Sequence, residues 1–395
     1  MKYWMLLWVV CIFGCSGNRY PDIPQEYHKL LDKAFARAGE NVIELNKAID
    51  SCDVRYKEGM AFLIAYMPEQ DLKTLKAGFL LNNVDYAYMV KEQFPWTRTL
   101  PDSIFFNEVL PYACLNETRD EWRADFYGRF LQYVASCETI EEAIDSVNRN
   151  IRDELKVDYN TKREKPDQSP YESMRQGMAS CSGLSILLVD AFRSVGIPAR
   201  VAGTPNWHDN RGNHNWCEVW INGQWYFTEY YPNALNKAWF FADAGKADKA
   251  DPQHAIYASS YKPADTYFPL VWDESIRYVN AENVTDRYVN LYKEYLTSVK
   301  GDGNHIPLKL MMFKTAQCTE NSDDRVAANV DVFCGKEQVG GGRTSGPEQD
   351  MNDVLEFLLE KNKTYTFKYT TTMGKDSGGD VKVGEYPVEV RLYME

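Results

Sequence analysis

The sequence predicts an α+β protein with a helical N-terminal region, a central helix packed on an antiparallel sheet, and a C-terminal β-sandwich. Three observations predict this class. Apolar residues follow helical spacing through the first third of the chain, an Asn-Gly pair joins two strand-like runs in the middle, and short strand-like runs follow residue 305. A chain of 395 residues is too long for one core. We therefore expect a helical region at 25–139, a core at 140–304 and a β-sandwich at 305–395.

The helical region shows a regular apolar stripe followed by a capped helix. The stripe continues through Met60–Met67 and Leu72–Tyr88, and it begins with Leu30, Leu31, Ala34, Phe35 and Ala38. Further on, the capping residues 136–139 precede Glu141 and Glu142, an arrangement that favours a helix start. We expect that helix to run to about Leu155.

The central stretch, residues 177–232, contains the residues most informative about function. Apolar residues recur at helical spacing from Leu184 to Val195, and Gly196 supplies the stop expected just past a helix. Cys181 therefore lies at the N-terminus of a helix. Backbone N–H groups and the positive end of the helix dipole stabilise a thiolate there.

A predicted hairpin follows this helix and brings an imidazole near a carboxylate. The Asn222-Gly223 pair between two alternating runs predicts a two-residue turn, so Ile221 opposes Gln224. The same register places Trp216 opposite Glu229, and His214 shares the face of Trp216. His214 and Glu229 are then diagonal neighbours about 7–8 Å apart at the backbone, within reach of long side chains.

This stretch resembles the transglutaminase-like core of the papain-type cysteine enzymes, over roughly residues 140–232. The matching residues are the helix-initial Cys181, the strand 197–200, and His214, Trp216, Glu218, Gly223, Trp225 and Glu229. The resemblance implies a papain-like fold in which Cys181 is the nucleophile, His214 the general base and acid, and Glu229 the residue that orients the imidazole. It also implies an oxyanion hole that uses the Cys181 backbone N–H and a side-chain donor, either Gln176 or Tyr171.

Two residues depart from the family pattern. Glu229 stands where the family usually has Asp, and its extra methylene moves the carboxylate by about one C–C bond, ~1.5 Å. Ala179 stands two residues before the cysteine, where Gly is frequent. The Glu229 departure keeps a non-catalytic binding or scaffold role among the alternatives.

The sequence pattern of the C-terminal part predicts a small antiparallel β-sandwich of ~90 residues. The expected strands are Leu308–Phe313, Val330–Cys334, Thr364–Thr372 and Val388–Tyr393. We interpret the glycine runs 340–342 and 378–379 as turns. The aromatic-rich stretch between 233 and 300 is interpreted mainly as cover for the edge of the core.

The N-terminus predicts export and lipid anchoring. Residues 1–14 read as a signal peptide, with Lys2 before a short apolar run. Cys15 follows as in a bacterial lipobox, so residues 15–24 would be a lipidated tether, with Ser16 typical of the outer membrane. The alternative is an ordinary signal peptide.

Seven cysteines remain after Cys11 and Cys15, an odd number that leaves a free thiol, and Cys318 and Cys334 form a candidate pair.

Composition and spacing limit the classes of partner. A formal net charge of −13 argues against nucleic-acid binding. We expect no cofactor and no metal, because C-x-x-C is absent and His28, His208, His254 and His305 lack ligand spacing. The loop pair His208-Asp209 is expected to be solvated.

Three functions are compatible with these observations. The first is a thiol-dependent amide hydrolase or peptidase that acts on peptides or on peptide-bearing cell-envelope material through a thioester. The second is a protein-glutamine transglutaminase, which passes the acyl group to an amine. The third is a non-catalytic binding or scaffold lipoprotein. Hydrolysis is favoured over transfer, because the sequence contains no recognisable amine-acceptor or calcium site.

Overall fold

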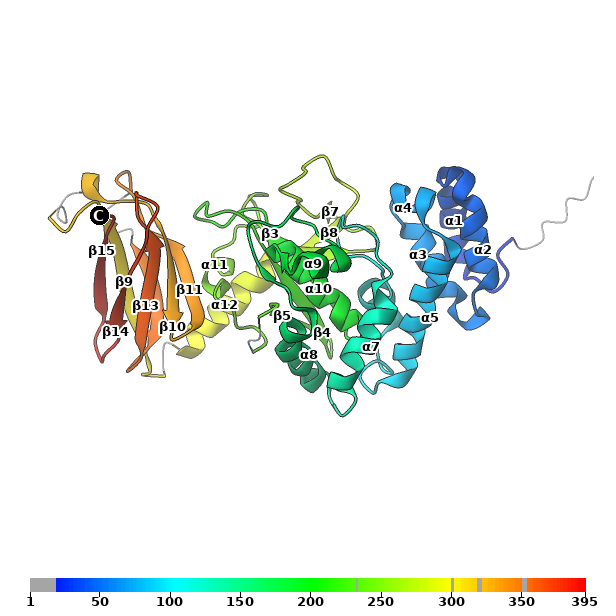
Figure 1. The fold of residues 1–395 in the computed structure, drawn as a ribbon, viewed down its shortest axis with the longest axis horizontal. Helices are drawn as coiled ribbons and strands as arrows, with labels where there is room; N and C mark the ends of the chain where they lie inside the picture. The colour runs from blue at the N-terminus through cyan, green and yellow to red at the C-terminus, as the bar shows by residue number, and fades with distance from the viewer. Residues whose placement is uncertain (1–18, 232–233, 300–301, 318–321, 350–353) are drawn as a thin grey trace, which may run out of the picture. The chain divides into compact units, whose positions relative to one another are not determined.

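The structure is a computed structural model that describes residues 19–231, 234–299, 302–317, 322–349 and 354–395. The predicted signal peptide at 1–14, Cys15 and Cys318 lie outside these residues. The chain divides into two compact units, residues 1–81 and 82–395. Helices and sheets are both extensive, so the predicted α+β class is confirmed (Figure 1).

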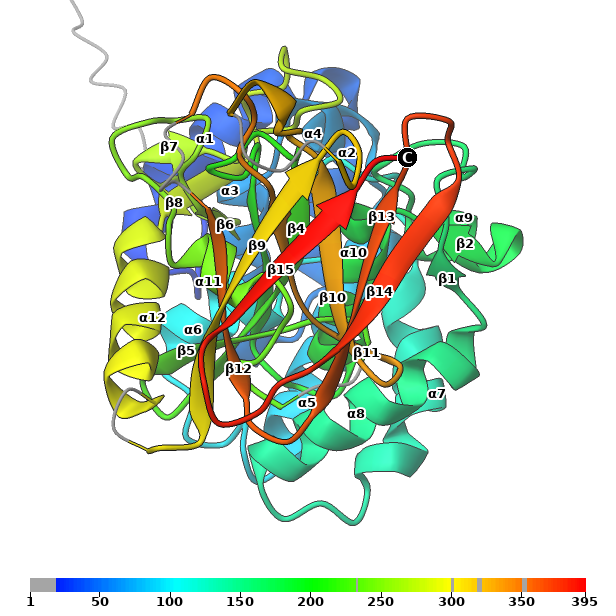
Figure 2. The same ribbon diagram turned by 90° about the vertical axis from the view of Figure 1, so that its left-hand side faces the viewer.

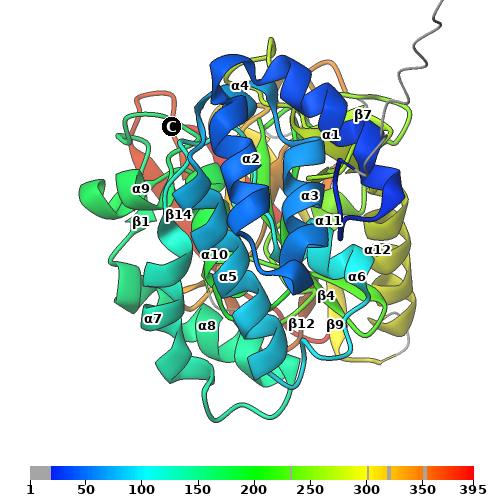
Figure 3. The same ribbon diagram turned by 90° about the vertical axis from the view of Figure 1, so that its right-hand side faces the viewer.

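The first unit is helical, as predicted. Its apolar stripe is buried at Leu31, Ala34, Phe35 and Ala38. Figure 3 shows α1, α2 and α3 side by side, and these three helices contact one another. The helices are α1 (Gln25–Arg37), α2 (Val42–Ser51), α3 (Lys57–Tyr66) and α4 (Glu69–Thr74), with 3₁₀ turns at Gly39–Asn41 and Val54–Tyr56; α5 (Ala77–Gln93) runs across the boundary into the second unit.

The helices of the second unit surround the central sheet. α8 (Ile140–Leu155) begins at a capping box between Thr139 and Glu142 and ends where the sequence predicted. The other helices are α6 (Asp102–Ile104), a π-helical turn (Phe105–Val109), α7 (Trp122–Val134), α9 (Pro170–Gln176), α10 (Cys181–Ser194), α11 (Phe241–Ala244) and α12 (Thr285–Val299).

The central sheet has the strand order β5-β4-β3-β6-β8-β7, and all its neighbouring strands are antiparallel. A separate two-residue pair, β1 (Asp158–Tyr159) with β2 (Met178–Ala179), is parallel. The strands of the sheet are β3 (Ala199–Thr204), β4 (His214–Ile221), β5 (Gln224–Thr228), β6 (Tyr257–Ser260), β7 (Thr266–Tyr267) and β8 (Asn280–Asn283).

Each face of this sheet is covered by a different apolar cluster. Val201, Cys217 and Val219 face α10 and join its leucines in one core. Trp216 and Phe227 point to the opposite face, where they pack with aromatic residues that include those near α11 and α12. The predicted packing of the cysteine helix on an antiparallel sheet is thus confirmed (Figure 1).

The C-terminal strands form two sheets around one shared core (Figure 2). One sheet has the order β11-β10-β13-β14 and the other β12-β9-β15. The strand pairing is antiparallel except between β15 and β9, which run parallel. We expected a purely antiparallel sandwich, so this part of the prediction is wrong. The strands are β9 (His305–Phe313), β10 (Asn329–Cys334), β11 (Glu337–Arg343), β12 (Leu355–Glu360), β13 (Thr364–Thr370), β14 (Asp376–Lys382) and β15 (Val388–Tyr393); a 3₁₀ turn occupies Ser322–Asp324.

The interpretation of both glycine runs as turns is wrong, because they lie inside β11 and β14. A Cβ on Gly342 would approach Leu355 Cδ1 to 2.5 Å, and a Cβ on Gly378 would overlap the carbonyl oxygen of Phe367. Glycine in a strand often marks such a close approach of a neighbouring group. The two groups that leave no room for a Cβ here, a leucine side chain and a backbone carbonyl, belong to other strands, so the local pattern resembles a turn.

The last two observations concern the candidate cysteine pair and membrane-spanning helices. Cys334 is a free thiol in the structure, and its candidate partner, Cys318, lies outside the described residues. Among the helices formed by the described residues, none combines the length and the apolar character that crossing a bilayer requires.

Candidate active site

Cys181 is the first residue of α10, as the sequence predicted. The preceding residue, Ser180, caps the helix by accepting a hydrogen bond of 3.1 Å from the Gly183 backbone N–H. One turn further, the Ser185 hydroxyl donates to the Cys181 carbonyl at 2.8 Å. These contacts fix the start of the helix, so Cys181 lies at the positive end of the helix dipole.

The β4–β5 hairpin brings His214 to Glu229. The register Ile221↔Gln224 is the predicted one, and Asn222 and Gly223 both have positive φ, 48° and 92°, as a type I′ turn requires. Imidazole Nε2 and the Glu229 carboxylate Oε1 are 2.8 Å apart. Their side chains are only 14% and 17% exposed, so this ion pair is largely shielded from water.

The imidazole also acts on Cys181, because His214 is the main group that lowers the pKa of that thiol. Because Nε2 is taken by Glu229, the nitrogen left for sulfur is Nδ1. Burial on its own raises the pKa of the Cys181 thiol, but the hydrogen bonds from His214, the Asn215 backbone and Ser182 bring that pKa below its ordinary value. Burial lowers the pKa of His214, and the hydrogen bonds to Cys181 and Glu229 outweigh it and raise that pKa to about 9. Both shifts favour a thiolate–imidazolium pair.

Of the three residues that the sequence singled out, His214 is hydrogen-bonded to Glu229, and it lowers the pKa of the Cys181 thiol. The longer side chain of Glu229 does not prevent the contact. Its backbone carbonyl accepts a hydrogen bond of 2.6 Å from Asn148 Nδ2 in α8, which holds the end of β5. A carboxylate so placed fixes the ring orientation and leaves Nδ1 facing the sulfur.

Aromatic rings enclose the imidazole on the sheet face away from α10. The ring centroids of Trp239 and Phe240 lie 5.0 and 5.3 Å from that of His214. Trp216 and Trp207 follow at 5.8 and 6.1 Å. Phe240 is fully buried and Trp239 is half-buried. The aromatic stretch after residue 233 therefore covers the core, as expected, and it also keeps water from one side of the imidazole.

The two candidates for the side-chain donor of an oxyanion hole differ in their contacts. The Tyr171 hydroxyl donates to the carbonyl of Glu121 at 3.1 Å, so its proton is used away from the sulfur. Gln176 Oε1 accepts from the Glu164 N–H at 3.1 Å, whereas its Nε2 is buried and has no hydrogen-bond partner among the described residues. Gln176 keeps a free donor, which an oxyanion hole requires.

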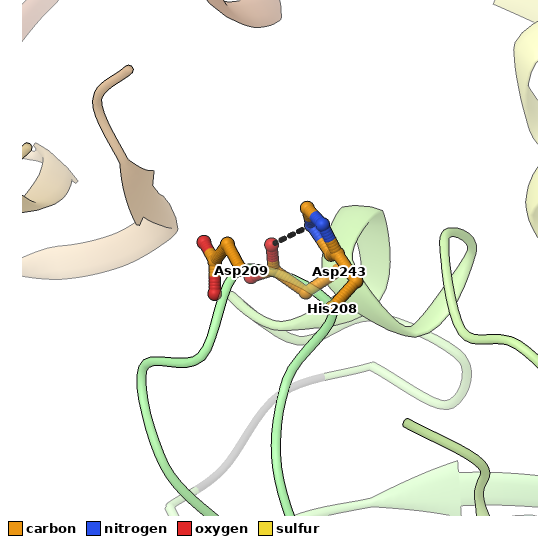
Figure 4. A group of neighbouring side chains, drawn as sticks. All are labelled: His208, Asp209 and Asp243. Carbon is orange, nitrogen blue, oxygen red and sulfur yellow. Dashed lines mark ion pairs between the residues drawn. The ribbon is translucent and has the colours of Figure 1, made fainter. Parts of the chain in front are cut away.

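A second group of ionisable residues lies on the loop before β4 and on α11. One ligand atom each of His208, Asp209 and Asp243 falls within 4.8 Å of the others (Figure 4). His208 Nε2 is 3.4 Å from Asp243 Oδ1. The guanidinium of Arg211 pairs with both carboxylates, at 2.7 Å to Asp209 and more closely to Asp243. Because this cation already balances their charge, the group ties the loop to α11.

The expectation that His208 and Asp209 are simply solvated is therefore wrong. Asp209 is 12% exposed and Asp243 is 3% exposed. Asp243 lies more than thirty residues further along the chain, so no local pattern connects it to the loop. The sequence interpretation also missed Ser182 and Asn215, which follow the cysteine and the histidine directly and lie buried between helix and strand.

Comparison with known proteins places the site in a described family domain. Residues 129–230 match the sequence model of the family described as "Transglutaminase-like superfamily". The matched range contains Cys181, His214 and Glu229, and it begins eleven residues before the start predicted for the core. No curated protein matches the chain.

Two solved structures are similar to parts of the chain. The first is described as a candidate cysteine protease from Cytophaga hutchinsonii, with 16% identity, a TM-score of 0.28, and coverage of 35% of this chain and 47% of that one. The second is the transglutaminase of red sea bream, with 10% identity, a TM-score of 0.28, and coverage of 77% and 59%. The chain thus spans about half of the first structure and about three fifths of the second.

Proposed function

We propose that the transglutaminase-like domain of this chain is a thiol-dependent amide hydrolase that cleaves peptides or peptide-bearing material of the cell envelope. The observation that supports the proposal is the hydrogen bond between His214 and Glu229, together with the effect of His214, which lowers the pKa of the Cys181 thiol at the N-terminus of α10. A thiol activated in this way is a nucleophile near neutral pH.

The proposed reaction proceeds through a thioester. The Cys181 thiolate attacks the amide carbonyl, and the developing oxyanion accepts hydrogen bonds from the Cys181 backbone N–H and from Gln176 Nε2. The His214 imidazolium then donates its Nδ1 proton to the leaving amine, and the C–N bond breaks. Neutral His214 next takes a proton from water, whose oxygen attacks the thioester. The C–S bond then breaks, the acid product leaves, and the Cys181 thiolate and the His214 imidazolium are restored.

Glu229 acts on the imidazole throughout this cycle. Its Oε1 accepts a hydrogen bond from His214 Nε2 at 2.8 Å, which fixes the tautomer, and its negative charge stabilises the imidazolium. It does not itself exchange a proton with the substrate. The enclosing aromatic rings keep bulk water from competing for the ring nitrogens.

The test is product analysis with a glutamine-containing peptide, with and without a primary amine. We expect free acid and ammonia, or two shorter peptides, and no activity in Cys181→Ala or His214→Ala. An amide adduct formed in preference to acid would instead indicate a transglutaminase. Absence of turnover from a panel of peptides and envelope-derived peptides, together with a slowly labelled Cys181, would contradict an enzymatic role.

We further propose that the chain is exported and anchored by lipid on Cys15, with the outer membrane as its destination. The support is the short apolar run with Lys2 before it and the small residues around Cys15. Incorporation of a labelled fatty acid into the full chain, lost in Cys15→Ser, is the expected result. Incorporation that persists in Cys15→Ser would contradict this anchor.

A further inference from the structure

We propose that Ser182 and Asn215 form a second, buried link between the cysteine helix and the histidine strand, in which Asn215 orients the Ser182 hydroxyl to donate a hydrogen bond to the Cys181 sulfur. Ser182 follows Cys181 in α10, and Asn215 follows His214 in β4. The inference rests on the proposed function, because it assigns two further residues to the same nucleophile.

The geometry of the link is direct. Asn215 Nδ2 donates to Ser182 Oγ at 2.7 Å, and the two side chains are 5% and 0% exposed. A hydroxyl oxygen that accepts from the amide has its own proton available to donate elsewhere. The thiol lies on the adjacent residue of the same helical turn, and the Ser182 side chain is among the groups that lower the pKa of that thiol.

The neighbouring strand leaves room for this arrangement. Gly203 in β3 is paired with Asn215 across the sheet. A Cβ at Gly203 would overlap the Asn215 side-chain oxygen and would come within 2.8 Å of the His214 carbonyl oxygen. The absence of a side chain at Gly203 therefore lets the Asn215 amide lie flat against β3 and reach α10.

Three neighbouring groups oppose the effect of burial, which raises the pKa of the Cys181 thiol. These are the imidazole of His214, the backbone N–H of Asn215 and the hydroxyl of Ser182. His214, with Glu229 behind it, is the titratable group that faces the sulfur directly. A neutral hydroxyl donor stabilises a thiolate at every pH, whereas the imidazole does so fully only while protonated. Ser182 therefore offsets part of the effect of burial on the pKa of the Cys181 thiol whether or not His214 is protonated.

The experiment measures the pKa of Cys181 itself, without any substrate. The full chain is alkylated with iodoacetamide across a pH series, and the peptide that contains residue 181 is quantified by mass spectrometry. In Ser182→Ala we expect the apparent pKa to rise by about one unit, the usual scale of a lost hydrogen bond to a charged group. Where turnover of an amide is measurable, kcat should fall more than KM changes.

The matched control is Ser194→Ala on the same helix. Ser194 is also fully buried and donates to the Ala191 carbonyl at 2.7 Å, so the variant loses a comparable hydroxyl far from the sulfur. It should leave the Cys181 pKa unchanged. The variant Asn215→Ala should raise the pKa less than Ser182→Ala does, and the double variant should match Ser182→Ala alone, because Asn215 acts through Ser182.

The outcomes separate this inference from the proposed function. If wild-type Cys181 titrates like an ordinary thiol, the proposed function fails. If wild-type Cys181 is acidic and stays equally acidic in Ser182→Ala, only the present inference is overturned. Additive shifts in the double variant would overturn the role assigned to Asn215. Folding of each variant is checked by its thermal midpoint before titration.

Discussion

Glu229 shows how far reasoning about single residues reaches. The turn at Asn222-Gly223 fixes the register, and the register alone places His214 beside Glu229, 2.8 Å apart in the structure. The contact of His214 with Cys181 has no such local cause, because it depends on how α10 packs across the sheet. Only the family resemblance predicted it. The sequence did not predict the contact between Ser182 and Asn215, because that contact also depends on how α10 packs across the sheet.

We predict that Glu229→Gln lowers kcat by roughly two to four orders of magnitude, since a neutral amide neither stabilises the imidazolium nor enforces its tautomer. Glu229→Asp should also lose activity, although less, because the shorter side chain must close a gap of about one C–C bond. Steady-state kinetics with a peptide amide checks both variants. Wild-type activity in Glu229→Gln would show that the carboxylate has no part in the reaction.

The pH dependence follows from the pKa of His214. Hydrogen bonds to Cys181 and Glu229 raise it to about 9 against the opposing effect of burial, so the imidazolium persists through neutral pH. We expect kcat/KM to fall as pH rises through about 9, where the acid that protonates the leaving amine is lost. Because Cys181 and His214 titrate as a coupled pair, the apparent pKa of this alkaline limb belongs to the pair and not to either residue alone. In Glu229→Gln this alkaline limb should move to lower pH; an unmoved limb would contradict the assignment.

The same shift has a consequence for stability, with a definite sign. The folded-state pKa of His214 is raised above its unfolded value of about 6.5. Its contribution to the free energy of unfolding is therefore fully present below about pH 6.5 and is lost as pH rises through about 9. Chemical denaturation of wild type and His214→Ala at pH 6 and pH 10 should show a larger difference at pH 6. An equal difference at both values would contradict the shift.

At the scale of helices and strands, the elements with strong local signals were predicted well. α8 has its capping box and α10 its helix-initial cysteine, and both lie where the sequence placed them. The failures have a common physical reason. Gly342 in β11 and Gly378 in β14 lie against a leucine side chain and a backbone carbonyl of other strands, and that requirement is visible only after the sheets have assembled.

The hairpin turn permits a clean test of one element. Gly223 has φ +92°, and no atom lies within 4 Å of the position that a Cβ would take there, so Gly223→Ala meets backbone strain alone. We expect a loss of roughly 1–2 kcal/mol in the free energy of unfolding. The control is Gly128→Ala in α7, equally open but helical, which should gain roughly 0.5–1 kcal/mol. Shifts of the same sign in both variants would contradict this account of the turn.

At the scale of the whole second unit, a buried ionic network joins the sheet to its flanking elements. Arg200 in β3 pairs with Glu218 in β4 at 2.9 Å, and Glu218 pairs in turn with Arg287 in α12. Glu108 lies 3.9 Å from the same Arg200, and the Arg200 guanidinium lies 3.8 Å from the ring centroid of Trp225. The sequence suggested Glu218 only as part of the family pattern. Its partners come from segments up to seventy residues away.

Glu108 makes this network sensitive to pH. Burial raises its pKa to about 7, although Arg200 and Arg193 oppose that shift. A carboxyl whose folded pKa is raised stabilises the fold below its unfolded pKa and loses that contribution as pH rises through about 7. We expect Glu108→Gln to be more stable than wild type at pH 8, by roughly 1–3 kcal/mol, and nearly equal at pH 5. Lower stability of the variant at pH 8 would show that the charged form is the stabilising one.

The most direct test of the central claim compares thiols within one chain. Brief alkylation at pH 6 is followed by mass spectrometry of the peptides that contain Cys181, Cys137 and Cys334, three free and partly exposed thiols. Burial raises the pKa of Cys137, whereas hydrogen bonds lower that of Cys181. We predict that Cys181 is labelled first by a wide margin and that this advantage disappears in His214→Ala. Labelling of Cys181 no faster than Cys137, or equally fast in His214→Ala, would contradict the thiolate–imidazolium pair.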